Sequence, residues 1–127
     1  MIIDAHGHYT TVPAAHRGFR ARQLAWLSDR SGPRPVEDTI GDDEIRESIE
    51  NNQLRYLRER GEDLMLISPQ ASAMEQHVPD PVVAVDWARS CNDLEHRVSG
   101  RFPDHFAAVC QLPQTPGGDL AEPITEL

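Results

Sequence analysis

The stretch 63-DLMLIS-68 is a short, nearly continuous apolar run that ends at Pro69. A run of this length between two helical patterns is typical of a strand buried on both faces of a parallel sheet. Residues 106–112, FAAVCQL, form a second apolar run of the same type. The chain begins with Met1-Ile2-Ile3, which reads as the start of a short strand. The sequence therefore predicts three strands of a parallel sheet.

Helical periodicity fills the segments between these strands. Apolar residues recur at helical spacing over 13–29, 43–60 and 82–99. We expect Asp42 to cap the start of the second of these helices, and Gly61 to take the left-handed position after its last turn. Strands that alternate with helices imply right-handed crossovers and a parallel α/β sheet.

The length of the chain limits how much of such a fold it holds. A closed barrel of eight β/α units needs about 250 residues. The helical pattern that begins near Leu120 is unfinished at Leu127. We therefore expect an α/β fold in which residues 1–127 are the N-terminal fragment of a single domain, with about three β/α units of a (β/α)8 TIM barrel.

Composition excludes several classes of partner. The formal net charge of −9 argues against a nucleic-acid surface, because phosphate contacts need clustered lysine and arginine. No apolar stretch is long enough to predict a membrane span, and the first residues do not resemble a secretory signal. Cys91 and Cys110 lack metal-site spacing and read as thiols in a reducing compartment. We expect a cytoplasmic protein.

The first ten residues contain the most specific chemical pattern. Side chains alternate along a strand, so Asp4, His6 and His8 are expected on one face, with His8 at the strand's carboxyl end. Two imidazoles at this spacing can bind one divalent cation, zinc first among them. The alternative is an ordinary surface or hydrogen-bonded pair. Asp4 either orients a histidine or makes a structural hydrogen bond.

These residues belong to a longer resemblance. IIDAHGHYTT resembles the first strand of the metal-dependent amidohydrolase superfamily, and the chain is similar to its aminocarboxymuconate-semialdehyde decarboxylase branch. It resembles the 4-oxalomesaconate hydratases more closely. The similar segments are HGHYTT.P, DDEIRESIE.NQL, ERG.DL..ISP.AS, CN.L..RVS..FPDHF and LPQ.PG.D.

The resemblance implies a (β/α)8 barrel with a catalytic zinc, or another divalent ion, held in part by His6 and His8. It implies that the remaining metal ligands and the catalytic acid and base lie beyond Leu127. The implied activity is that of a hydro-lyase, which adds water to 4-oxalomesaconate or a similar unsaturated oxo-carboxylate in aromatic catabolism. The alternatives are a metal-dependent decarboxylase or hydrolase of the same superfamily, and an inactive truncated chain.

The loop after residues 63–68 supplies candidate substrate contacts. Gln70 and Ser72 could hydrogen-bond a carboxylate of a small di- or tricarboxylate substrate, and His77 could contact it or donate a proton. Each has a plain alternative as a polar loop residue. The similar hydratases have arginine where this chain has Gln70, so the substrate could differ. Families of this kind often assemble, and we expect a homo-oligomer from the full-length protein.

Overall fold

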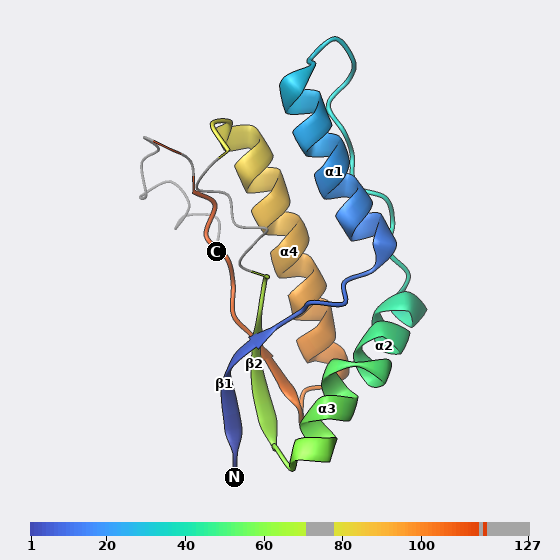
Figure 1. The fold of residues 1–127 in the computed structure, drawn as a ribbon, viewed down its shortest axis with the longest axis vertical. Helices are drawn as coiled ribbons and strands as arrows, with labels where there is room; N and C mark the ends of the chain where they lie inside the picture. Colours follow the sequence, from blue (N-terminus) through green and yellow to red (C-terminus); the bar gives the residue numbers. More distant parts are fainter. Residues whose placement is uncertain (71–77, 115, 117–127) are drawn as a thin grey trace.

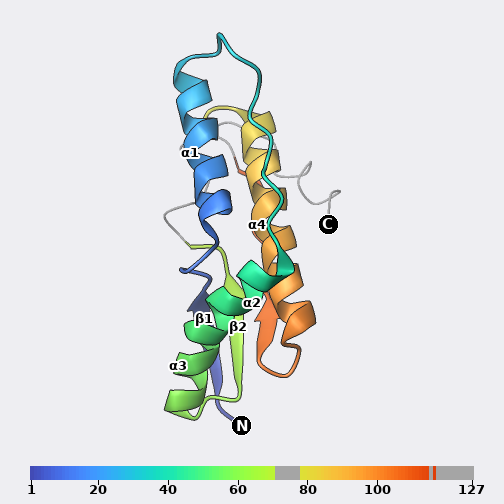
Figure 2. The same cartoon turned by 90° about the vertical axis from the view of Figure 1, so that its right-hand side faces the viewer.

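The fold is seen in a computed structural model that describes residues 1–70, 78–114 and 116. Three parallel strands lie in the order β1-β2-β3: β1 Ile3–His8, β2 Leu64–Ser68 and β3 Phe106–Ala108. The helices are α1 Ala14–Ser28, α2 Asp42–Asn51, α3 Gln53–Arg60 and α4 Pro81–Arg101. Figure 1 shows α1 beside α4, and Figure 2 shows α2 and α3 in front of the strands.

The core lies between the strands and α2, α3 and α4. Met65 and Ile67 of β2 face it and are 6% and 0% exposed. Leu64 and Leu66 alternate with them and are only half-buried. The prediction of burial on both faces is therefore wrong for the described part of the chain, where only one face of β2 has helices packed on it. In a closed barrel the other face points to the interior.

The helix predicted over 43–60 differs from the structure in two ways. The single helix expected over 43–60 is divided at Asn52, whose backbone leaves the helical region with φ −128° and ψ −95°. The Asn52 side chain donates to the carbonyl oxygen of Ser48 at 2.8 Å and so competes with the backbone. The helix begins after Gly41, so Asp42 is its first residue and not its cap.

The third strand is shorter than the segment 106–112 predicts. β3 ends at Ala108, and Gln111 is bonded to α4 instead of to β2. Its backbone N–H donates to Asn92 Oδ1 at 2.7 Å, and Asn92 Nδ2 donates back to its carbonyl oxygen at 2.9 Å. The helix expected near Leu120 lies outside the described residues.

α4 is the longest helix and has a strong N-terminal cap. Asp80 Oδ1 accepts from the backbone N–H groups of Val82 and Val83, both at 3.1 Å. Pro81 takes the first helical position, where its missing N–H has no consequence. No helix in the described ranges is long and apolar enough to cross a membrane.

Candidate metal and substrate site

His6 and His8 come together at the carboxyl end of β1. Their rings are 4.8 Å apart at an interplanar angle of 85°, and their Nε2 atoms are 3.3 Å apart. His6 is exposed and His8 is half-buried. The sequence prediction that the two imidazoles converge therefore agrees with the geometry.

The end of β2 fixes the tautomer of His8. Its Nδ1 lies 3.0 Å from the carbonyl oxygen of Pro69 and 2.9 Å from Ser68 Oγ. A carbonyl oxygen can only accept, so Nδ1 carries the proton. Ser68 Oγ donates to the carbonyl oxygen of Gly7 at 3.1 Å and can accept from the ring. The Nε2 of His8 is left with a lone pair that points toward His6.

The nitrogen pair fits two positions of a zinc site. Zinc–nitrogen bonds of about 2.0–2.1 Å at a tetrahedral angle place two ligands roughly 3.3–3.4 Å apart. The observed separation of 3.3 Å falls in that range. A hydrogen bond from the His6 ring to the His8 ring has a similar length. Among the described residues no group of three or more His, Cys, Asp and Glu side chains is arranged around a metal position.

Asp4 does not contact either ring. Its Oδ1 accepts from the backbone N–H of His6 at 3.0 Å, so Asp4 makes a structural hydrogen bond. A register shift lies between Asp4, paired with Met65, and Gly7, paired with Ile67. Asp4 and Gly7 are three residues apart, whereas their partners in β2 are two apart, so β1 has one extra residue here. Simple alternation therefore does not place Asp4 on the face of the two histidines.

Gln53 of α3 stabilises the carboxyl end of β1 through hydrogen bonds, and sequence reasoning missed it. Its Nε2 donates to the carbonyl oxygen of His8 at 3.4 Å and to Thr10 Oγ1 at 3.2 Å, while its Oε1 accepts from Thr11 at 2.8 Å. Gln53 occupies the core position between Ile49 and Leu57, at four-residue spacing. A polar residue in that apolar stripe was the available signal.

A hollow of about 300 Å³ opens at the carboxyl ends of the three strands. His8 and Ser68 line it, together with Gln111 and Gln114 from the segment after β3. Gln111 is 6% exposed, and neither atom of its side-chain amide has a hydrogen-bond partner among the described residues. A buried amide without a partner is costly, so this group is available to a ligand in the hollow. Nothing in the local sequence pattern indicated Gln111.

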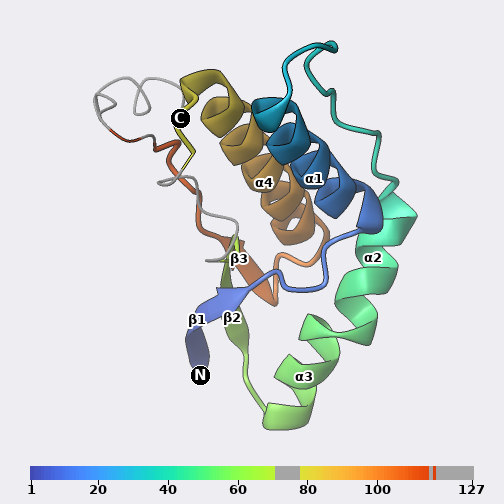
Figure 3. The same cartoon turned by 45° about the horizontal axis from the view of Figure 1, so that its top comes forward.

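Gln70 borders a different space from His8. It is exposed and lines a second cavity of about 260 Å³, with Tyr9 and Thr10. Residues of α1 and α4, which lie side by side in Figure 3, line most of the rest of this cavity. Pro69 borders both spaces. The structure therefore brings His6 and His8 together but does not bring Gln70 into the hollow beside His8. Ser72 and His77 lie outside the described residues.

The same second cavity contains a buried acid. Glu95 of α4 is 2% exposed, and within the described part of the chain its Oε2 has no hydrogen-bond partner. Burial raises the pKa of this carboxyl to about 9. At neutral pH the group is therefore protonated and able to donate.

The strand ends, the histidine pair and the βα order define the class of protein. The family model described as Amidohydrolase matches residues 3–127, and the chain belongs to this family. Its fold is that of the N-terminal β/α units of an amidohydrolase-like TIM barrel.

Particular relatives are hydratases by name. The chain is 53% identical over 127 residues to the 2-keto-4-carboxy-3-hexenedioate hydratase of Sphingobium sp. strain SYK-6, and covers 37% of it. The crystal structure of 4-oxalomesaconate hydratase LigJ from Rhodopseudomonas palustris matches 99% of the chain at 46% identity and a TM-score of 0.89. The chain again covers 37% of that protein. An amidohydrolase II structure, 14% identical with a TM-score of 0.53, shares the fold over 89% of the chain and 32% of its own length.

Proposed function

We propose that the complete protein is a zinc-dependent hydro-lyase that hydrates 4-oxalomesaconate or a similar unsaturated oxo-carboxylate in aromatic catabolism. The support from relatives is the hydratase names of the two proteins that match at 53% and 46% identity. The observation that carries the proposal is the pair of Nε2 atoms 3.3 Å apart at the carboxyl end of β1. Chemistry in α/β barrels collects at this end of the strands.

His6 and His8 would hold the metal through Nε2. When bound, such a metal polarises a substrate oxygen or lowers the pKa of a water molecule. Pro69 and Ser68 keep the Nδ1 proton of His8 in place, which leaves Nε2 basic. A zinc site of this type has three or four protein ligands, so one or two more are needed. These ligands and the groups that move the proton would come from outside residues 1–127.

The hollow beside His8 would receive the substrate. We assign the side-chain amide of Gln111 to a carboxylate or hydroxyl oxygen of the substrate, because this amide is buried and has no partner in residues 1–70, 78–114 and 116. Gln70, Ser72 and His77 remain proposed substrate contacts. For Gln70 this requires part of a di- or tricarboxylate to reach past Pro69 toward the second cavity. Glutamine at this position lacks the charged, bidentate grip of arginine.

Product analysis of the complete gene product tests the reaction class. Hydration removes the conjugated double bond, so ultraviolet absorbance of 4-oxalomesaconate or 2-keto-4-carboxy-3-hexenedioate should fall and the product should gain one water. A decarboxylase, the second candidate within the family, would release carbon dioxide instead. If the protein neither hydrates nor decarboxylates these substrates, the proposed enzyme is contradicted. We further propose that the complete protein is a cytoplasmic homo-oligomer. Size-exclusion chromatography with light scattering would measure its assembly.

A further inference from the structure

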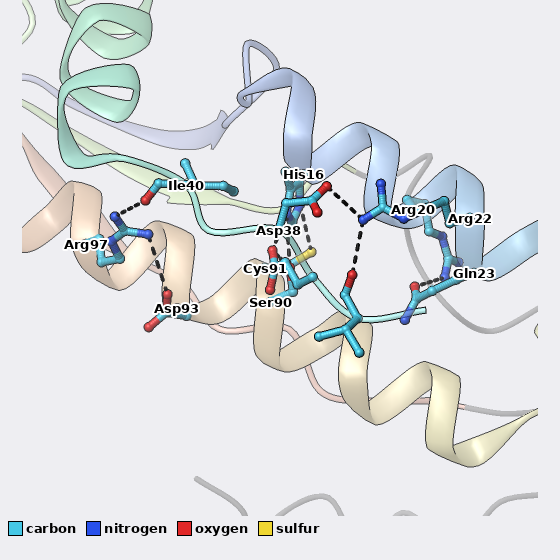
Figure 4. Close-up of polar contacts among 12 residues, drawn as sticks. His16, Arg20, Arg22, Gln23, Asp38, Ile40, Ser90, Cys91, Asp93 and Arg97 are labelled. Carbon is cyan, nitrogen blue, oxygen red and sulfur yellow. Dashed lines mark hydrogen bonds and ion pairs between the residues drawn. The ribbon is translucent and has the colours of Figure 1, made fainter. Parts of the chain in front are cut away.

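A cysteine and a histidine meet inside the cavity between α1 and α4, away from the His6–His8 pair. Cys91 Sγ of α4 lies 3.7 Å from His16 Nε2 of α1. The two residues are 4% and 3% exposed. Figure 4 shows both side chains together, with Ser90 next to them. Neither residue lines the hollow beside His8.

The Glu37 carboxylate determines which nitrogen of His16 carries the proton. Ser90 Oγ donates its one proton to Glu37 Oε1 at 2.5 Å, since a carboxylate can only accept. The contacts of His16 Nδ1, 3.0 Å to Ser90 Oγ and 3.4 Å to Glu37 Oε1, therefore require a proton on Nδ1. Nε2 then has a lone pair directed at the thiol. The arrangement has the order nucleophile, base and orienting acid.

An ionised carboxylate and an aromatic ring both lie against His16. Burial acts to raise the pKa of Glu37, but hydrogen bonds from His16 and Ser90 outweigh it and lower the pKa, so the carboxylate is ionised. Trp87 stacks on the His16 ring with centroids 4.4 Å apart and an interplanar angle of 26°. An aromatic face stabilises a neighbouring cation. Nε2 can therefore accept the proton of the thiol while Glu37 and Trp87 stabilise the charge on the ring. The sulfur then becomes a thiolate, the reactive form of cysteine.

The cavity connects this pair to the surface. Its volume is about 260 Å³, and its lining runs from Cys91 and His16 to the exposed residues Arg17, Leu24 and Gln70. This space admits a small molecule but not a macromolecule. The neutral carboxyl of Glu95 and the side chain of Arg20 also line it.

We propose that Cys91 is an oxidative modification site, activated by His16 and Glu37, whose reactant is hydrogen peroxide. The thiolate attacks one peroxide oxygen, the S–O bond forms and the O–O bond breaks. The leaving hydroxide takes the proton held on His16 and becomes water. Sulfur is oxidised to sulfenic acid as the peroxide is reduced by two electrons, so the step needs no further reactant. This inference is independent of the proposed hydratase activity.

The first experiment measures thiolate character by alkylation of the complete gene product with iodoacetamide, followed by peptide mass spectrometry. The ratio of the alkylation rates of one cysteine at two pH values cancels the effect of how easily the reagent reaches that thiol. An ordinary thiol slows by about 80-fold between about pH 9 and pH 6.5. We expect Cys91 to slow by less than tenfold. In the Glu37→Gln and His16→Gln variants the decrease should approach that of an ordinary thiol, whereas Glu50→Gln, an exposed control on α2, should not change it.

The second experiment treats the protein with hydrogen peroxide and traps sulfenic acid with dimedone. A dimedone adduct on Cys91 that Glu37→Gln slows is the expected result. Glu37→Gln keeps the side chain's shape, so it remains informative if His16→Gln does not fold, which circular dichroism would show. An ordinary pH profile at Cys91, a thiol that stays unreactive in the folded protein, or the absence of the adduct would each overturn the proposal.

Discussion

Gly7 stands between the two histidines and lies directly against β2. A Cβ at this position would contact Met65 Cγ, lie 2.6 Å from Met65 Sδ and lie 2.9 Å from the carbonyl oxygen of Leu66. Met65 is 6% exposed and has little room to move, and the carbonyl oxygen belongs to the backbone of the neighbouring strand. The Gly7→Ala change must therefore push β1 away from β2. His6 and His8 would move with it.

We expect Gly7→Ala to lower the free energy of unfolding by about 1–3 kcal/mol, the usual cost of overpacking a core. The control is Gly100→Ala in α4, where a Cβ meets no atom within 4 Å and alanine should stabilise the helix by roughly 0.5–1 kcal/mol. Urea denaturation of the complete gene product, followed by tryptophan fluorescence, gives both values. Zinc content should also fall in Gly7→Ala alone. Equal stability of the two variants would refute the close contact between β1 and β2.

Three further predictions concern α4 and the second cavity. Asp80→Ala should cost about 1 kcal/mol of stability because it removes the cap of α4, whereas Asp80→Asn should cost less, as measured by urea denaturation. Burial acts to raise the pKa of Asp80, but the Val83 N–H and Arg30 lower it overall, so the stabilisation should be lost as the pH falls. Burial of Glu95, whose pKa rises to about 9, makes unfolding easier as the pH rises from about 5 to 9, because only the unfolded chain loses the proton. Glu95→Gln should remove this pH dependence in denaturation curves and raise stability at neutral pH; an unchanged slope would contradict it. Gln70→Ala should raise KM more than it lowers kcat in steady-state assays, and unchanged kinetics would make Gln70 an ordinary loop residue.

Local periodicity was sufficient to predict most of the fold. Helical spacing placed α1 and α4 to within two residues, and the apolar run at 63–68 located β2. These signals are local, because a helix or strand has to present its apolar side chains at a fixed period. The convergence of His6 and His8 was also predictable, since residues two apart in a strand share a face.

The features that were missed depend on contacts between distant parts of the chain. Asn92 draws Gln111 toward α4 and ends β3 early, which no pattern within 106–112 indicates. The register shift between Asp4 and Gly7 depends on pairing with β2. His16 and Cys91 are 75 residues apart, and only the packing of α1 on α4 joins them.

We propose above all that His6 and His8 form part of the metal site of a hydratase. The most direct measurement is the zinc content and the hydration rate of the complete gene product and its His6→Ala, His8→Ala double variant. The control is His96→Ala, which removes an exposed histidine of α4. We predict about one zinc per chain and full activity in the wild type and the control, with both lost in the double variant. A double variant that keeps stoichiometric zinc would contradict the assignment of the two histidines.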